Sequence, residues 1–118
     1  MTPHGPAVDA AHLASLRALY GADNFARLRG IFLDETRDRV AELRGAAAAG
    51  DGAAVKRVAH RMVSLLGAFG ARAPAEMARA VADSDSGDVA EGAEPLALAT
   101  EAARDAVLEL GDAGDGSV

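Results

Sequence analysis

The chain of 118 residues contains no cysteine, so it can form neither disulfide bonds nor thiolate metal sites. It also has no apolar run long enough to cross a bilayer. Met1–Ala7 has neither the basic start nor the apolar stretch of a secretory signal. These absences predict a soluble protein with no membrane partner, and the lack of cysteine is consistent with a cytoplasmic location.

Positive charge is scarce as well. The chain has 12 Lys and Arg residues and 18 Asp and Glu residues, which gives a net charge of −6. Because such a chain repels phosphates, we expect no nucleic-acid partner. The three histidines are widely separated in the sequence, and their spacing matches no metal-ligand motif. We therefore expect no metal site in the chain itself.

Alanine contributes much to the apolar half of the composition, whereas aromatic residues make up only 3%. This combination is typical of helices that pack closely against one another. The length predicts one domain with a single modest core.

Apolar residues at helical spacing predict five helices. Asp9 and Asp51 are suited to cap the first and third of them, and Gly21 and Gly50 to end the first and second. The predicted ranges are about 9–20, 23–48, 51–70, 74–83 and 95–110, with a loop or a poorly formed turn over 84–94. The pattern also allows the last helix to start as early as Asp88. Pro74 and Pro95 are placed in the first turns of the last two helices.

Two of these helices have a predicted inward face. That of the long second helix consists of Phe25, Leu28, Phe32, Thr36, Val40, Leu43 and Ala47. That of the last helix consists of Leu96, Ala99, Ala103, Val107 and Leu110.

Short connections between the helices predict that neighbours run antiparallel. The expected fold is all-α: an up-down-up-down antiparallel four-helix bundle over residues 8–110, with the short N-terminal helix lying across it. Residues 1–7 are predicted to be a flexible leader and residues 111–118 a flexible tail.

His60 is the most informative side chain, because it lies opposite the apolar stripe of its helix. At roughly 100° per residue, His60 is about 160° from the centre of that stripe. The stripe consists of Val55, Val58, Ala59, Met62, Leu65, Leu66 and Phe69. The face around His60 consists of Ala53, Lys56, Val63, Ser64 and Gly67. An exposed imidazole on such a face is suited to meeting another macromolecule, and it is poorly suited to closing a pocket around a small substrate.

Three short motifs occur in order around this helix: Gly50-Asp51, Ala59-His60-Arg61-Met62 and Gly70-Ala71. Together they resemble the signature of the histidine phosphotransfer (HPt) domain of bacterial phosphorelays, namely Gly-Asp, then Ala-His-x-Leu-Lys-Gly, then Gly-Ala. The resemblance extends over most of the chain. Leu16, Leu19, Tyr20 and Gly21 look like the family's leader helix, and Phe25–Leu43 resembles its long second helix.

The resemblance implies a phosphocarrier rather than a turnover enzyme. His60 would take a phosphoryl group from an aspartyl phosphate on a receiver domain and pass it to another receiver. An exposed imidazole is largely neutral at cytoplasmic pH and is then nucleophilic without a separate base. The implied partners are response-regulator receiver domains, a hybrid histidine kinase, or both. The receiver would supply the magnesium ion, and the family default is a monomer.

Two positions depart from the family pattern beside the histidine. Val63 replaces the usual lysine, and Ser64 replaces the usual glycine. Lys56 and Arg57 lie one turn earlier and lean away from His60, so they are imperfect substitutes for the missing charge. The docking face we expect comprises Lys56, Arg57, Ser64 and Gly67, with Ala53 and Val63 at its edge.

Two other interpretations are open. A domain of the same fold could bind a receiver or kinase without being phosphorylated, which the valine at position 63 favours. A bundle that binds a small molecule would need an internal apolar cavity, and a core so rich in alanine is not suited to leave one.

Overall fold

Five α-helices make up most of the residues that the computed structural model describes, which are 7–85 and 89–115. Their bounds are Ala10–Tyr20 for α1, Ala22–Ala48 for α2, Gly52–Ala68 for α3, Arg72–Ala82 for α4 and Ala93–Asp115 for α5, with a 3₁₀ turn at Val89–Gly92. These residues contain no strand, which confirms the predicted all-α class. None of the described helices is long and apolar enough to span a membrane.

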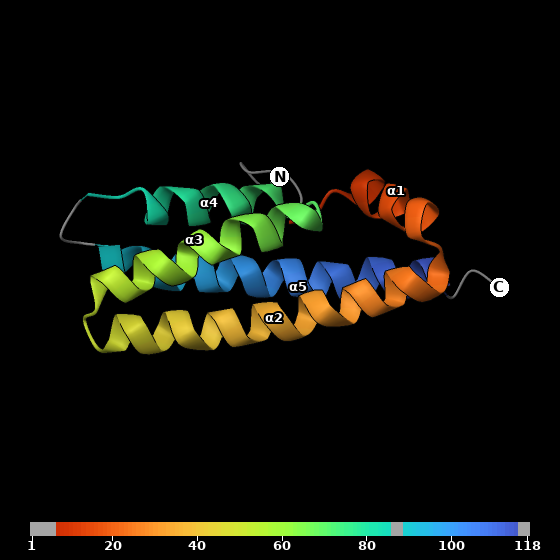
Figure 1. Cartoon of the computed structure of the whole chain (residues 1–118). Helices are drawn as coiled ribbons and strands as arrows, with labels where there is room; N and C mark the ends of the chain where they lie inside the picture. Colours follow the sequence, from red (N-terminus) through yellow and green to blue (C-terminus); the bar gives the residue numbers. More distant parts are fainter. Residues whose placement is uncertain (1–6, 86–88, 116–118) are drawn as a thin grey trace.

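The long helices α2 and α5 lie side by side, and α3 packs against both α2 and α4 (Figure 1). The chain reverses direction at each connection from α2 to α5 (Figure 1). Helix α1 lies at the end of the molecule where α2 begins, next to the junction between α3 and α4 (Figure 1). A backbone hydrogen bond of 2.9 Å from Asp9 N–H to the Gly70 carbonyl ties the start of α1 to that junction.

Two aspartates start helices as the sequence predicts. Asp9 Oδ1 accepts hydrogen bonds from the backbone N–H groups of Ala11 and His12, at 3.0 and 3.2 Å. Asp51 Oδ1 accepts one from the N–H of Ala54 at 3.0 Å. Because the first N–H groups of a helix have no partner within it, these carboxylates fix where α1 and α3 begin.

The core is built on the apolar stripe of α2. Of its seven predicted inward residues, five are buried and the other two, Leu28 and Ala47, are half-buried. All three phenylalanines of the chain meet at one place: the Phe69 ring centroid lies 4.6 Å from that of Phe32 and 6.1 Å from that of Phe25. This cluster joins the C-terminal end of α3 to α2.

Pro74 and Pro95 each stand in the third position of their helix rather than at its first residue. Helix α4 begins at Arg72, two residues before Pro74, and α5 begins at Ala93, two residues before Pro95. The prediction that Pro74 and Pro95 lie in first turns is confirmed, and α5 begins between the two predicted limits, Asp88 and Pro95. Any position in the first turn tolerates the missing N–H of proline. The predicted loop 84–94 also contains the 3₁₀ turn, whose Val89 is buried in the core.

The end of α5 differs from the prediction. Leu110 was expected to point inward, but it is 38% exposed and lines a shallow groove with Leu13 and Phe25. Here α5 extends beyond the ends of α3 and α4 and lies beside α1 and the start of α2 (Figure 1). The residues of α5 that are buried are Ala93, Leu96, Ala97, Thr100, Ala103 and Val107. The helix continues to Asp115, whereas residues 1–6 of the predicted leader and 116–118 of the predicted tail lie outside the described residues.

An ionic cluster connects α2 to the first turns of α5. The Arg44 guanidinium donates hydrogen bonds to both carboxylate oxygens of Glu94, each at 2.9 Å, and to those of Glu101, at 2.9 and 3.0 Å. These hydrogen bonds lower the pKa values of Glu94 and Glu101, because they favour the charged carboxylates.

Replacing Phe32 by alanine tests the aromatic cluster. Phe32 is 1% exposed and stacks on Phe69, so F32A should lower the free energy of unfolding by about 3–5 kcal/mol. Its neighbour Ile31 is 52% exposed, and I31A should change stability by less than about 0.5 kcal/mol. Urea unfolding followed by circular dichroism measures both, and equal losses would contradict the placement of the core.

Replacing Arg44 by methionine tests the ionic cluster through pH. Folded-state pKa values below the usual range make Glu94 and Glu101 stabilising above the pKa of an unfolded glutamate, about 4.3. This contribution is lost as the pH falls through the folded-state values. Wild type should therefore exceed R44M in thermal stability at pH 7, and the gap should narrow by pH 3. The control is R37M, because Arg37 pairs only within α2 among the described residues; a gap for R44M that is independent of pH would contradict the expectation.

Candidate functional site

Helix α3 holds His60 outward because the residues beside it are packed inward. Val58, Ala59 and Met62 are buried in the core, and Ala59 has no exposed surface at all. His60 follows Ala59 directly in the helix and is exposed, as the stripe predicts. Burial of its neighbours thus fixes the direction of the imidazole.

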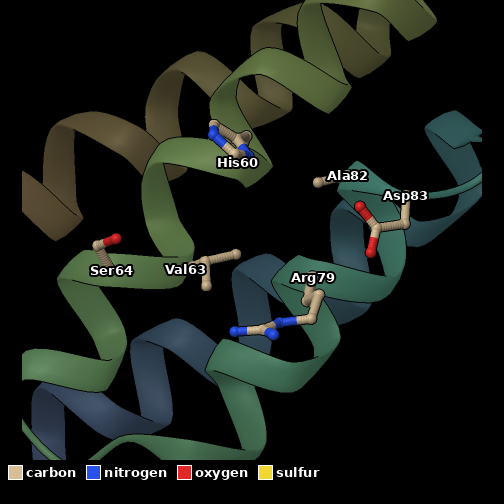
Figure 2. Close-up of a pocket in the computed structure, with 6 residues that line it drawn as sticks. All are labelled: His60, Val63, Ser64, Arg79, Ala82 and Asp83. Carbon is tan, nitrogen blue, oxygen red and sulfur yellow. The ribbon is translucent and has the colours of Figure 1, made fainter.

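A groove of about 240 Å³ runs between α3 and α4 beside His60. Figure 2 shows its walls: His60, Val63 and Ser64 come from α3, and Arg79, Ala82 and Asp83 lie on and just after α4. The Arg79 side chain reaches from α4 toward α3 near Val63, and the Asp83 carboxylate is turned toward the same space (Figure 2).

A second, more open hollow of about 410 Å³ lies on the other side of the imidazole. Lys56, Arg57 and Arg61 line it together with His60 and Ala82. His60 and Ala82 border both hollows, so the imidazole lies where the two hollows meet. Arg61 is also paired with Glu42 of α2, at 3.6 Å.

The structure brings four of the predicted docking residues to these hollows. Lys56 and Arg57 line one of them, and Val63 and Ser64 line the other. Ala53 and Gly67 are exposed on α3 but line neither hollow. A Cβ added at Gly67 would meet nothing within 4 Å, so packing inside the described chain does not require a glycine there.

The hollows beside His60 are also lined by four residues that were not predicted to belong to the site: Arg61, Arg79, Ala82 and Asp83. The sequence contained information that could have placed the α4 residues beside His60. In an antiparallel helix pair that turns near Gly70, a residue about ten positions before the turn lies opposite one about ten positions after it. His60 therefore lies across from residues near position 80. Within the described residues, no group of three or more His, Asp or Glu side chains could hold a metal ion.

Comparison with known protein families identifies the fold. The sequence model of the Hpt domain matches residues 27–111, which reach from the first turns of α2 into α5 and include His60. The chain belongs to the Hpt domain family. Hpt domains act in histidine phosphotransfer within phosphorelays, as phosphocarrier modules that interact with receiver domains and kinases. No curated protein and no solved structure gives a significant match to the chain.

The glycines of the motifs on either side of α3 have structural roles in this Hpt domain. Gly50 has φ +70° and Gly70 has φ +73°, a left-handed conformation that residues with a Cβ rarely adopt. Each glycine follows the end of a helix, and the backbone N–H of the next residue donates a hydrogen bond to a carbonyl in the last turn of that helix. Asp51 N–H donates to the Ala46 carbonyl at 2.9 Å, and Ala71 N–H donates to the Leu66 carbonyl at 3.0 Å.

Gly70 has an additional reason to be glycine. A Cβ at this position would lie 3.0–3.1 Å from three atoms of the His12 side chain. The His12 ring packs there because its Nε2 is hydrogen-bonded to the Ala68 carbonyl, at 2.9 Å. The motif glycine thus leaves room for α1 to pack against the end of α3.

The paired variants G50A and G70A separate these two roles. Both place a Cβ in the left-handed region, which should cost about 1–2 kcal/mol of stability. At Gly50 the added Cβ meets nothing within 4 Å, whereas at Gly70 it lies 3.0–3.1 Å from three His12 atoms, so His12 must shift by a few tenths of an ångström. We therefore expect G70A to lose about 1 kcal/mol more than G50A, through the His12 hydrogen bond. Urea unfolding measures the difference, and equal losses would argue against the His12 contact.

Proposed function

We propose that His60 is the phosphoacceptor of this Hpt domain and relays a phosphoryl group between receiver-domain aspartates. One observation carries the proposal: the imidazole is exposed on α3 and borders two hollows that are lined by cationic side chains. A phosphorylated partner can approach it from outside without any opening of the fold. The positive charges favour the approach of a phosphoryl group, whose oxygens are negative.

The proposed chemistry needs little from the chain besides position. The unprotonated ring nitrogen of His60 attacks phosphorus, the P–O bond to the partner's aspartate breaks, and the aspartate leaves as a carboxylate. The reverse step delivers the phosphoryl group to the next receiver. We assign the magnesium ion to the receiver, and this chain then needs no cofactor of its own. Phosphoryl transfer of this kind depends mainly on alignment and electrostatic stabilisation.

The proposed scaffold is an up-down-up-down four-helix bundle formed by α2, α3, α4 and α5, acting as a monomer. The alternating chain direction in Figure 1 supports the arrangement of the four helices. The proposed docking face comprises Lys56, Arg57, Ser64 and Gly67, with Ala53 and Val63 at its edge, and the partners are receiver domains, a hybrid histidine kinase, or both. Small and apolar groups surrounded by charge suit a transient interface.

A second candidate is a docking module that binds a receiver or kinase and is not phosphorylated. The residue that favours it is Val63, an apolar side chain in the groove beside His60 where the family usually has lysine. The two candidates differ in whether His60 accepts a phosphoryl group.

Phosphorylation with phosphoramidate, followed by intact-mass spectrometry at neutral pH, tests the proposal. Wild type should gain one acid-labile phosphoryl group, and H60A should gain none, because the nucleophile is absent. H12Q is the matched control: it removes the other histidine among the described residues, leaves His60 in place and should be labelled like wild type.

An unlabelled wild type, with its helices intact and a reference Hpt domain labelled in parallel, would contradict the carrier and favour the docking module. Receiver binding gives a second readout. H60A should still bind a receiver but abolish relay output, whereas unchanged output would point to docking alone.

A further inference from the structure

Helix α4 places a cationic side chain in the groove that contains His60. Arg79 is exposed, lies in the last turn of α4 and lines this groove with His60, Val63 and Ser64. Figure 2 shows its side chain extending toward α3 rather than away from it. Within the described part of the chain, its guanidinium has no ion-pair partner, so it can bind an incoming anion without first breaking a contact.

We infer that Arg79 is a phosphate-binding residue of the transfer site, contacting the phosphoryl group as it bonds to His60. The inference rests on the proposed function of His60. A guanidinium presents several N–H donors in a planar fork, which matches two oxygens of one phosphoryl group. On the α3 side of the groove, Val63 is apolar and Ser64 carries no charge, so Arg79 is the cation among the residues that line it.

Asp83 is the acidic residue of the same groove, and its negative charge must be counted against the cations around His60. It follows Arg79 by one helical turn, and its backbone N–H donates to the Arg79 carbonyl at 2.9 Å. The two hollows beside His60 together contain four cationic residues, Lys56, Arg57, Arg61 and Arg79, and this one carboxylate. Arg61 is paired with Glu42, which leaves three cations against Asp83. The surroundings of the imidazole are therefore positive even though the chain is acidic overall.

Arg79 also has a possible structural role, which the test must separate from phosphate binding. A cation in the last turn of a helix stabilises it by interacting with the negative end of the helix dipole. That role would alter the unfolding of the domain. It would not alter the ionisation of a phosphoryl group on His60.

The experiment compares wild type, R79A, R79K and R27A in phosphoramidate labelling. In this reaction a ring nitrogen of His60 bonds to phosphorus, the P–N bond of the reagent breaks, and ammonia leaves. We expect R79A to be labelled about three- to tenfold more slowly, as for loss of one partly solvated charged contact. The labelling rate of R79K should stay within about twofold of the wild-type rate, because lysine keeps the positive charge. R27A removes the same charge from an exposed site near the start of α2, at the other end of the bundle, and should label at the wild-type rate.

Phosphorus NMR of the labelled proteins supplies the second readout. A guanidinium beside the phosphoryl group favours its doubly charged form, so the phosphate pKa measured in R79A should be higher than in wild type and R27A. Urea unfolding of the unlabelled proteins checks that R79A is folded under these conditions.

The outcomes distinguish the two proposals. Labelled wild type with R79A equal to R27A in rate and phosphate pKa would overturn the role of Arg79 and leave His60 as the phosphoacceptor. A slower R79A with an unchanged phosphate pKa would also overturn phosphate binding. Unlabelled wild type, with a reference Hpt domain labelled, would overturn the function of His60 and with it the inference about Arg79.

Discussion

The direction of the His60 side chain depends on the burial of one apolar stripe. Val55, Met62 and Leu66 of α3 have no exposed surface. Burying a side chain of this size contributes roughly 1.5–3 kcal/mol. A rotation of α3 that covered the imidazole would expose these residues and lose most of that stabilisation. The helix therefore presents His60 to solvent through hydrophobic packing, and among the described residues no hydrogen bond or ion pair holds the imidazole.

The features of the fold that are local in the sequence could be predicted. The caps by Asp9 and Asp51 depend on a carboxylate reaching an N–H two or three residues away, so the sequence contains both partners. Pro74 and Pro95 lie in first turns as predicted, but they do not fix the first residue of either helix, because proline is allowed throughout a first turn. The exposure of Leu110 could not be predicted from periodicity, since it depends on where the neighbouring helices end.

The residues of the candidate site also divide into those that local sequence can place and those whose position depends on tertiary packing. His60, Lys56 and Ser64 lie on one helix, so their spacing along α3 is enough to place them together. Arg79 and Asp83 come from the end of α4, and their position beside His60 depends on how two helices pack. Antiparallel pairing of α3 and α4 limits the residues that can lie beside His60 to those near position 80. Which of them point into the groove is decided by tertiary contacts that the periodicity of α4 alone does not specify.

The packing of α4 therefore matters for the chemistry proposed for α3. Side chains of one helix keep fixed relative positions, so Lys56, Arg57 and His60 form a set that changes little with the rest of the fold. Arg79 belongs to another helix, and its distance from the imidazole is set by how closely α4 approaches α3. Small buried residues, Ala59 on α3 and Ala78 on α4, allow the helices of this core to pack closely. An alanine-rich core thus suits a close approach of α4 to α3, and Arg79 of α4 lines the same groove as a histidine whose own helix has valine at the position of the family's lysine.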